Sequence, residues 1–144
     1  NLTQALEESL DRWDRPLKME GCELSRNIEK ELYANLDKDR FDQIVSNLLS
    51  NCIKYAPRRP VKVSLAQSED QLVLTVKDHG PGIDPDKLDL IFEQFERGVG
   101  ASGVSGLGLG LFISKSIAEE HKGDLKVESK EDGCAFILTL PTLR

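Results

Sequence analysis

The 144-residue sequence contains few cysteines, no long apolar run and no block of basic residues. Cys22, Cys52 and Cys134 are odd in number and lack CxxC spacing, which argues against a disulfide framework or a zinc site and predicts buried, reduced thiols. A membrane-spanning helix needs about 20 consecutive apolar residues. The longest candidate run, around Leu107–Ile113, is broken by glycine, so we expect neither a membrane span nor a signal peptide.

Basic residues are also fewer than acidic ones. There are 19 Lys and Arg against 25 Asp and Glu, which gives a formal net charge of -6. An acidic chain without clustered Lys and Arg does not favour binding to a nucleic-acid backbone. The 39% hydrophobic content is enough for a core, and the length predicts one domain over residues 1–144.

Three helices are expected from apolar residues that recur every three or four positions. The first runs from Leu2 to Leu17 and stops near Gly21; the second is capped by Asp37 and ended by Pro57. The third runs from Gly108 through Ile117 to a glycine stop at Gly123. A short additional helix is expected after Asp84 and Pro85, carrying Leu88, Ile91, Phe92 and Phe95.

Alternating apolar residues predict the strands. Runs 61–65 and 72–76 indicate an antiparallel hairpin, and runs 125–129 and 135–140 indicate two strands joined by a turn at Asp132–Gly133. Weaker strand patterns occur at Glu23–Ile28 and Leu32–Leu36. This order of elements predicts an α/β fold, a two-layer sandwich in which helices pack on one face of a mixed sheet.

Glycine is concentrated in one segment, since six of the 11 glycines fall between Gly98 and Gly110. One interpretation is a flexible surface loop. The other is a phosphate site, because Gly106-Leu107-Gly108-Leu109-Gly110 leads into a helix whose bare backbone N–H groups and positive dipole end suit phosphate oxygens.

Asp78 begins a second motif, Asp78-His-Gly80-Pro-Gly82, at the end of a predicted strand. Its carboxylate could merely accept bonds from the backbone of a tight turn. Alternatively, it could accept a hydrogen bond from a planar ligand such as an exocyclic amine, while the glycines let that ligand lie against the backbone.

Asn47, Asn51 and Lys54 form a polar stripe on the second helix, with Tyr55 at its border. The stripe could simply face solvent. Two asparagines one turn apart are nevertheless unfavourable for a helix unless their amides are used. An amide oxygen suits a magnesium ion that bridges phosphates, a lysine neutralises phosphate charge and a tyrosine ring can cover a base.

Together these motifs resemble the N, G1, F and G2 boxes of sensor histidine kinases. The matching segments occur in the family order and the similarity extends from about Leu2 to Leu140; they are 47–55, 78–83, 92–97 and 106–111. The resemblance implies the Bergerat ATP-binding fold, shared with gyrase, a heat-shock chaperone and mismatch-repair ATPases. It also implies ATP and Mg²⁺ as cofactors.

The resemblance assigns roles to individual residues. Asp78 would bind the adenine amino group, and Gly80, Gly82 and Ile83 would shape the base pocket. Asn51, helped by Asn47, would hold magnesium, and these two with Lys54 would form the catalytic set. Other implied nucleotide contacts are Tyr55, Phe95 and Arg97 and, against the phosphates, Gly106, Leu107, Gly108, Leu109 and Gly110. Residues 97–106 would form a lid over ATP, with Phe92 and Phe95 at its base.

The sequence departs from the family in lacking the phosphoacceptor box, a His followed closely by Glu and Thr-Pro. Its only histidines are His79, within the G1 turn, and His121, near a helix end where partial positive charge is stabilised. Cys52 stands where the family usually has alanine, and we assign it no function. The chain thus resembles a catalytic domain cut from a longer kinase, with the helix in residues 1–20 near the junction to a missing dimerisation domain.

The implied function is transfer of the γ-phosphoryl group of MgATP to a histidine on a separate dimerisation domain in two-component signalling. The alternatives are an ATP-hydrolysing switch, a serine-directed kinase or a silent binding module of the same fold. Hydrolytic relatives carry a glutamate one turn before the metal-binding asparagine, where this chain has Asn47. Expected partners are the dimerisation domain and, indirectly, a response regulator. We expect a cytoplasmic, monomeric fragment whose parent could be anchored in the inner membrane.

Overall fold

The computed structural model describes residues 1–55, 58–79, 105–130 and 133–142, with only the backbone described at 54–55, 105–111 and 129–130. The helices are α1 (Leu2–Met19), α2 (Lys38–Tyr55) and α3 (Ser105–Glu120). The strands are β1 (Leu24–Ile28), β2 (Val61–Ser68), β3 (Gln71–Lys77), β4 (Asp124–Lys130) and β5 (Gly133–Pro141). No described helix is both long and apolar enough to cross a bilayer.

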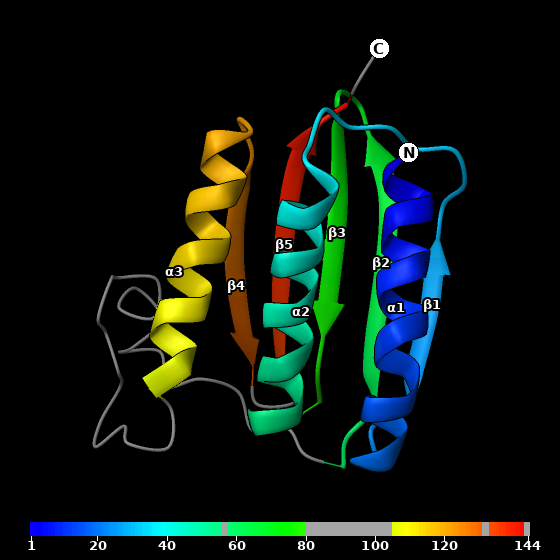
Figure 1. Ribbon diagram of the computed structural model, residues 1–144, viewed down its shortest axis with the longest axis vertical. Coiled ribbons are helices and arrows are strands. Elements are labelled where there is room, and N and C mark those ends of the chain that lie inside the picture. The colour runs from blue at the N-terminus through cyan, green and yellow to red at the C-terminus, as the bar shows by residue number, and fades with distance from the viewer. Residues whose placement is uncertain (56–57, 80–104, 131–132, 143–144) are drawn as a thin grey trace.

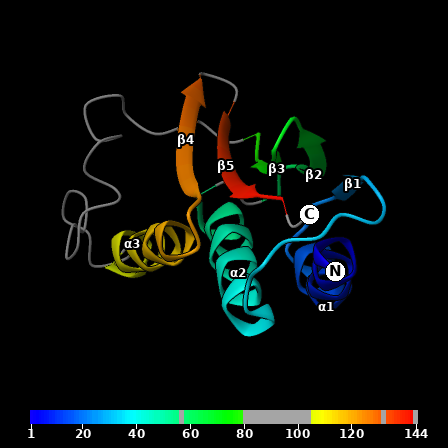
Figure 2. The same ribbon diagram turned by 90° about the horizontal axis from the view of Figure 1, so that it is seen from above.

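The five described strands form one mixed sheet in the order β1-β2-β3-β5-β4. Strand β1 is parallel to β2, whereas the β2–β3, β3–β5 and β4–β5 pairs are antiparallel. All three described helices lie on the same face of this sheet (Figures 1 and 2). The predicted α/β two-layer sandwich and the predicted antiparallel hairpin are therefore confirmed.

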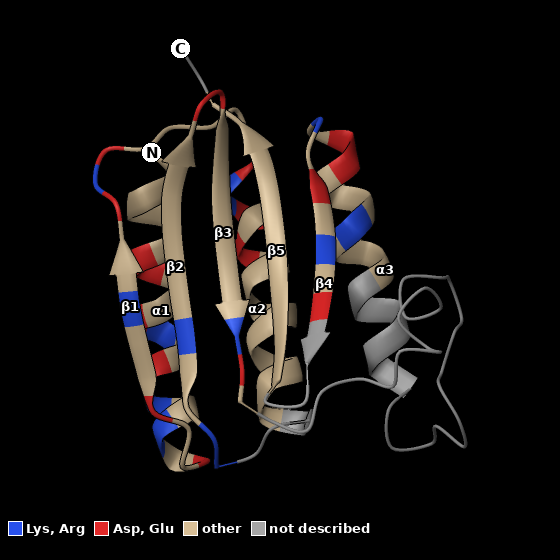
Figure 3. Ribbon diagram, turned by 180° about the vertical axis from the view of Figure 1, so that it is seen from behind, with Lys and Arg blue, Asp and Glu red and all other residues tan. Residues whose placement is uncertain are grey.

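The hydrophobic core lies between the sheet and the helices. Along β3, Leu72, Leu74 and Val76 are buried and alternate with half-buried residues, because successive side chains of a strand point to opposite faces. The helices contribute mainly leucine and isoleucine at helical spacing, including Leu6, Leu10, Ile44, Leu48 and Ile117. Seen from behind, the other face of the sheet carries no described helix, and its central strands are largely uncharged (Figure 3).

Helix α1 is fixed firmly to its neighbours. Trp13 Nε1 donates to Ser46 Oγ of α2 at 3.2 Å, and Arg26 of β1 donates to Glu7 and Asp11, each at 3.0 Å. Burial opposes the charge of the Arg26 guanidinium, but these two acidic partners outweigh it and raise its pKa. The helix ends as predicted near Gly21, whose φ of 75° is the left-handed conformation that glycine adopts without strain.

Helix α2 begins with the predicted cap. Asp37 Oδ1 accepts from the backbone N–H of Asp39 at 2.8 Å, and the Asp37 carbonyl accepts from Phe41. These bonds satisfy N–H groups that lack partners inside the helix. The helix ends at Tyr55, two residues before Pro57.

Helix α3 differs from its prediction at both ends. It begins at Ser105, not at Gly108, so three glycines lie within its first two turns. It ends at Glu120, and Lys122, rather than Gly123, adopts the left-handed conformation with a φ of 65°. Gly123 is required for another reason: a Cβ there would lie 2.1 Å from the carbonyl oxygen of Thr139 on β5.

The strand predicted at Leu32–Leu36 is wrong, because this segment is a connection without regular structure. Its main chain bonds to the start of α1 instead: the Leu32 carbonyl accepts from Leu2 N at 2.8 Å, and Leu32 N donates to Thr3 Oγ1 at 3.0 Å. Leu32 is buried against the core. Its apolar pattern therefore reflected packing rather than pairing in the sheet.

Two further predictions lie outside the described residues. They are the short helix that would carry Leu88, Ile91, Phe92 and Phe95, and Asp132 of the predicted turn.

Candidate functional site

Asp78 lies immediately after β3 and is buried, with 4% of its surface exposed. It faces Cys134 at the start of β5, because Lys77 pairs with Ala135 in the preceding step of the ladder. The Asp78 N–H donates to the Cys134 carbonyl at 2.9 Å, and the Cys134 N–H donates to Asp78 Oδ1 at 3.1 Å. One carboxylate oxygen thus replaces a main-chain carbonyl in the ladder, which fixes the side chain at the sheet edge.

Gly133 makes this arrangement sterically possible. Its φ is 146°, and a Cβ built on it would lie 2.1 Å from the Asp78 carbonyl oxygen. Only glycine allows both the conformation and the close approach. The sequence predicts only that Gly133 lies in a turn, and it indicates no role for Gly133 or Cys134 at the site. The aspartate and its supports are 55 and 56 residues apart, so only the β3–β5 pairing brings them together.

Cys52 follows Asn51 in α2. Its thiol is fully buried, and burial, followed by the negative charge of Asp78, raises its pKa far above the ordinary value. The thiol therefore stays protonated, in agreement with the predicted buried, reduced state of all three cysteines. The negative charge of Asp78 thus acts on the turn of α2 that also carries Asn51.

Asn51 is buried, with 5% exposure, and its Nδ2 has no hydrogen-bond partner among the described residues. An unpartnered buried amide is costly, so it indicates a group that completes it. In a phosphate with a bound cation, a phosphate oxygen would accept a hydrogen bond from Nδ2 and the cation would bind the amide oxygen. Within the described residues, no group of three or more His, Cys, Asp or Glu could hold a metal ion. An amide oxygen such as that of Asn51 is chemically suited to a magnesium ion that keeps most of its waters.

Asn47 lies one helical turn before Asn51 and is bonded across to α3. Its Nδ2 donates to Ser114 Oγ at 3.0 Å. The two asparagines therefore differ. The Asn47 amide links α2 to α3, whereas the Asn51 Nδ2 has no partner among the described residues. Sequence reasoning missed Ser114, since a serine within an apolar helix gives no spacing signal.

The remaining predicted nucleotide contacts that the structure describes are placed only by their backbone. Lys54 and Tyr55 occupy the last turn of α2, and residues 106–110 occupy the first turns of α3. The end of α2, the end of β3 and the start of α3 all lie at the same end of the domain (Figure 1). Gly80, Gly82, Ile83, Phe92, Phe95 and Arg97, with lid residues 98–104, lie outside the described residues.

Both histidines have backbone partners. His79 Nδ1 donates to the Pro60 carbonyl at 2.9 Å, and the His79 carbonyl accepts from Arg59 Nη1 at 3.1 Å. His121 Nδ1 donates to the Ile117 carbonyl at 2.7 Å, just after the end of α3. These contacts fit a structural role for each ring.

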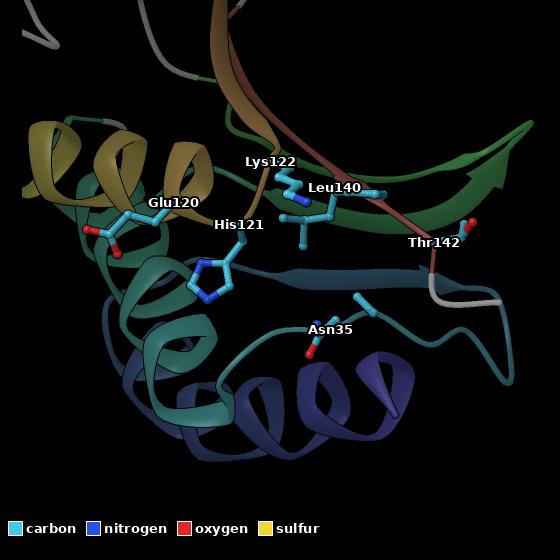
Figure 4. Close-up of a pocket in the computed structure, with 8 residues that line it drawn as sticks. Asn35, Glu120, His121, Lys122, Leu140 and Thr142 are labelled. Carbon is cyan, nitrogen blue, oxygen red and sulfur yellow. The ribbon is translucent and has the colours of Figure 1, made fainter.

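A separate hollow of about 190 Å³ lies at the opposite end of the domain, beside the C-terminal end of α3. His121, Lys122 and Leu140 are among the residues around it, and Asn35 lies across from His121 (Figure 4). The volume is below the roughly 300 Å³ at which small-molecule sites begin. None of the predicted nucleotide contacts lines it.

An ion pair joins α3 to β4. Lys115 Nζ donates to Asp124 Oδ1 at 2.9 Å and to the Leu125 carbonyl at 3.2 Å. The lysine holds the pKa of the Asp124 carboxyl below its ordinary value. This contact attaches the helix that begins at the candidate phosphate site to the edge of the sheet.

Comparison with known proteins adds independent information. Residues 36–144 match the family model described as histidine kinase-, DNA gyrase B-, and HSP90-like ATPase. The sensor protein SrrB of Staphylococcus aureus is 37% identical over 125 residues, which cover 84% of this chain and 21% of SrrB. The chain thus spans about a fifth of the length of the curated relatives it matches.

Solved structures agree with this match. A mycobacterial sensor histidine kinase, MprB, is 30% identical with a TM-score of 0.82, over 98% of this chain and 94% of that chain. The catalytic domain of the histidine kinase ThkA has a TM-score of 0.86 at 24% identity, over 98% and 93% of the two chains. A second ThkA structure is a complex with the response regulator protein TrrA.

Proposed function

The chain belongs to the histidine kinase-, DNA gyrase B-, and HSP90-like ATPases, and within them to the catalytic domains of sensor histidine kinases. From this membership we propose which of its residues bind each part of MgATP. The domain binds MgATP between the end of β3 and the facing ends of α2 and α3. It then presents the γ-phosphoryl group to a histidine of a separate dimerisation domain.

Asp78 carries the proposal. Its buried carboxylate is held at one oxygen by the Cys134 N–H, so it forms a fixed acceptor for the adenine amino group. A carboxylate accepts hydrogen bonds but donates none, which favours an amino-bearing purine over an oxo-bearing one. Gly80, Gly82 and Ile83 follow it directly in the chain and complete the base pocket in this proposal, with Tyr55 and Phe95 as further walls.

The phosphates lie at the other end of the proposed site. Asn51 with Asn47 holds Mg²⁺, which neutralises phosphate charge and aligns the γ-phosphoryl group when bound. Lys54 and Arg97 add positive charge. The backbone of Gly106, Leu107, Gly108, Leu109 and Gly110, at the start of α3, supplies N–H groups where the helix dipole favours anions.

Transfer is favoured over hydrolysis by the residue one turn before Asn51. A hydrolase needs a base there to orient and deprotonate water, but Asn47 has no useful basicity, and its Nδ2 already donates to Ser114. Transfer to a histidine is therefore the preferred reaction. The ATP-hydrolysing switch and the serine-directed kinase are alternatives that experiment can separate from it.

The proposed partners follow from the same reaction. The acceptor histidine lies on a dimerisation domain of the same or a partner chain, and α1 lies near the junction with it. A response regulator receives the phosphoryl group afterwards, as the ThkA complex with TrrA suggests by analogy. Localisation at the cytoplasmic side, with a membrane-anchored parent, is part of the proposal.

The adenine assignment is tested with Asp78→Asn. Asparagine keeps an oxygen that accepts from Cys134 N–H, so circular dichroism should show an intact fold. Calorimetry should show ATP affinity lower by about hundredfold, the scale of one lost charge-assisted hydrogen bond. Asp11→Asn, at an exposed position of α1, is the matched control and should bind ATP like the wild type. Undiminished affinity in Asp78→Asn would remove the assignment.

The transferase assignment is tested with radiolabelled ATP. Alone, the chain should show little self-phosphorylation; mixed with its cognate dimerisation domain, it should label a histidine there. Acid lability of the label distinguishes phosphohistidine from phosphoserine. Rapid release of free phosphate without an acceptor would favour the hydrolytic alternative.

A further inference from the structure

Ser114 is a fully buried polar residue in the middle of α3, with 0% exposure. Its Oγ accepts from Asn47 Nδ2 at 3.0 Å, across an interface between two helices, and the bonded residues are 67 positions apart in the chain. Buried polar side chains that bond each other across an interface fix the register of the two elements, because a shift of either one leaves both unsatisfied.

The position of this bond relates it to the proposed phosphate site. Asn47 lies one turn before Asn51 on α2, and Ser114 lies one turn after Gly110 on α3. Side chains four residues apart lie on the same face of a helix. The bond therefore joins the two helices one turn away from Asn51, the proposed magnesium ligand, and one turn away from Gly110, the last of the glycines that would face the phosphates.

The bond also fixes the Asn47 carboxamide. The oxygen and nitrogen of an amide group diverge from one carbon atom, so holding Nδ2 against Ser114 sets the direction of the amide oxygen. A buried serine could instead serve only to satisfy the Asn47 donor. That simpler role would affect folding stability and nothing else.

We infer that Ser114 is a positioning residue for magnesium. Its hydroxyl orients the Asn47 side chain and fixes the position of α2 relative to α3, so that the Asn47 and Asn51 amides and the start of α3 can bind the same Mg²⁺-phosphate group. This inference rests on the proposed function. It predicts that loss of the hydroxyl affects binding of ATP with magnesium much more than binding of ATP without it.

The test measures ATP affinity of the 144-residue chain by calorimetry, in magnesium and in EDTA. Ser114→Ala removes a single oxygen, and alanine is the most favourable helix residue, so the fold should persist. Affinity in magnesium should fall by about tenfold, equivalent to about 1.4 kcal/mol. Affinity in EDTA should stay within about twofold of the wild type.

Ser9→Ala provides a matched control. Ser9 is also a buried serine, and its hydroxyl bonds a side chain of α2, Asp42, but from α1 on the other side of that helix. Both variants should lower the thermal midpoint, whereas only Ser114→Ala should change the magnesium dependence of ATP binding.

A double-mutant cycle shows whether Ser114 acts through Asn47. In an Asn47→Ala background, Ser114→Ala should cause no further loss of affinity in magnesium. The inference is overturned by an unchanged affinity of Ser114→Ala, by equal losses in magnesium and EDTA, or by the same loss in the Asn47→Ala background. A wild-type chain that binds no ATP in either buffer would instead overturn the proposed function itself.

Discussion

The carboxylate of Asp78 accepts a hydrogen bond from the backbone N–H of Cys134 at 3.1 Å, although 56 residues separate them in the chain. This bond continues the β3–β5 ladder through a side chain, in place of the main-chain carbonyl. As a result, the first residue after β3 is held by the sheet itself. A ligand that bonds Asp78 thus meets a group already ordered before binding, which reduces the entropy lost on association.

Gly133→Ala should damage this arrangement. The new Cβ would meet the Asp78 carbonyl oxygen at 2.1 Å in a backbone conformation that alanine rarely adopts. Urea denaturation should show a lower free energy of unfolding, and calorimetry should show weaker ATP binding. Gly21→Ala is the matched control: its φ is 75°, but the new Cβ would approach Arg58 Cγ only to 3.4 Å. Its free energy of unfolding should fall by about 1 kcal/mol because of backbone strain, and its ATP affinity should be unchanged. Equal ATP affinity in the two variants would contradict the proposed role of Gly133.

The three thiols should react only when the protein opens. Cys22, Cys52 and Cys134 are all buried, and the raised pKa of Cys52 removes its thiolate at neutral pH. A thiol reagent should label the native chain slowly and the urea-unfolded chain rapidly. Where global opening limits the rate, saturating MgATP at about 100 times its Kd should slow labelling by about a hundredfold. Fast labelling of Cys52 in the native chain would show that the thiol is not shielded.

The contact between Lys115 and Asp124 should make stability depend on pH in the acid range. The folded-state pKa of Asp124 is lowered from 3.8, chiefly by the hydrogen bond from Lys115. Its stabilisation is therefore present above 3.8 and is lost as pH falls through the lower folded-state pKa. Urea denaturation should show Asp124→Asn less stable than wild type near about pH 6, with the difference shrinking in more acidic buffer. In a Lys115→Met background the same substitution should have little pH-dependent effect; a persistent difference would assign it to another partner.

Helix α1 should be essential for stability. Leu10 is fully buried in the core shared with α2, so Leu10→Ala should reduce the free energy of unfolding by about 2–5 kcal/mol. Met19, at the end of the same helix, is 76% exposed, and Met19→Ala should change it by less than about 0.5 kcal/mol. Thermal and urea denaturation would measure both. A small loss for Leu10→Ala would mean that α1 packs only loosely on the domain.

Local patterns in the sequence were sufficient where one helix or strand buries one face. The Asp37 cap, the buried stripe of α2 and the alternation of β3 follow from rules that involve residues close in the chain. The same rules failed at Leu32, whose burial comes from the bonds of its segment to α1. They also misplaced the start of α3, because glycine lowers helix propensity although a glycine-rich segment can still be helical in a folded protein.

The sequence by itself determined the α/β class, the motif order and the residue types able to bind a purine, a metal and phosphates, because these depend on side-chain chemistry and short-range spacing. Only the tertiary structure decided that Cys134 and Gly133 hold Asp78, that Asp78 acts on Cys52, and that Ser114 holds Asn47. Each of these interactions involves residues 26 to 67 positions apart. Such pairs are selected by strand pairing and helix packing, which no local pattern records.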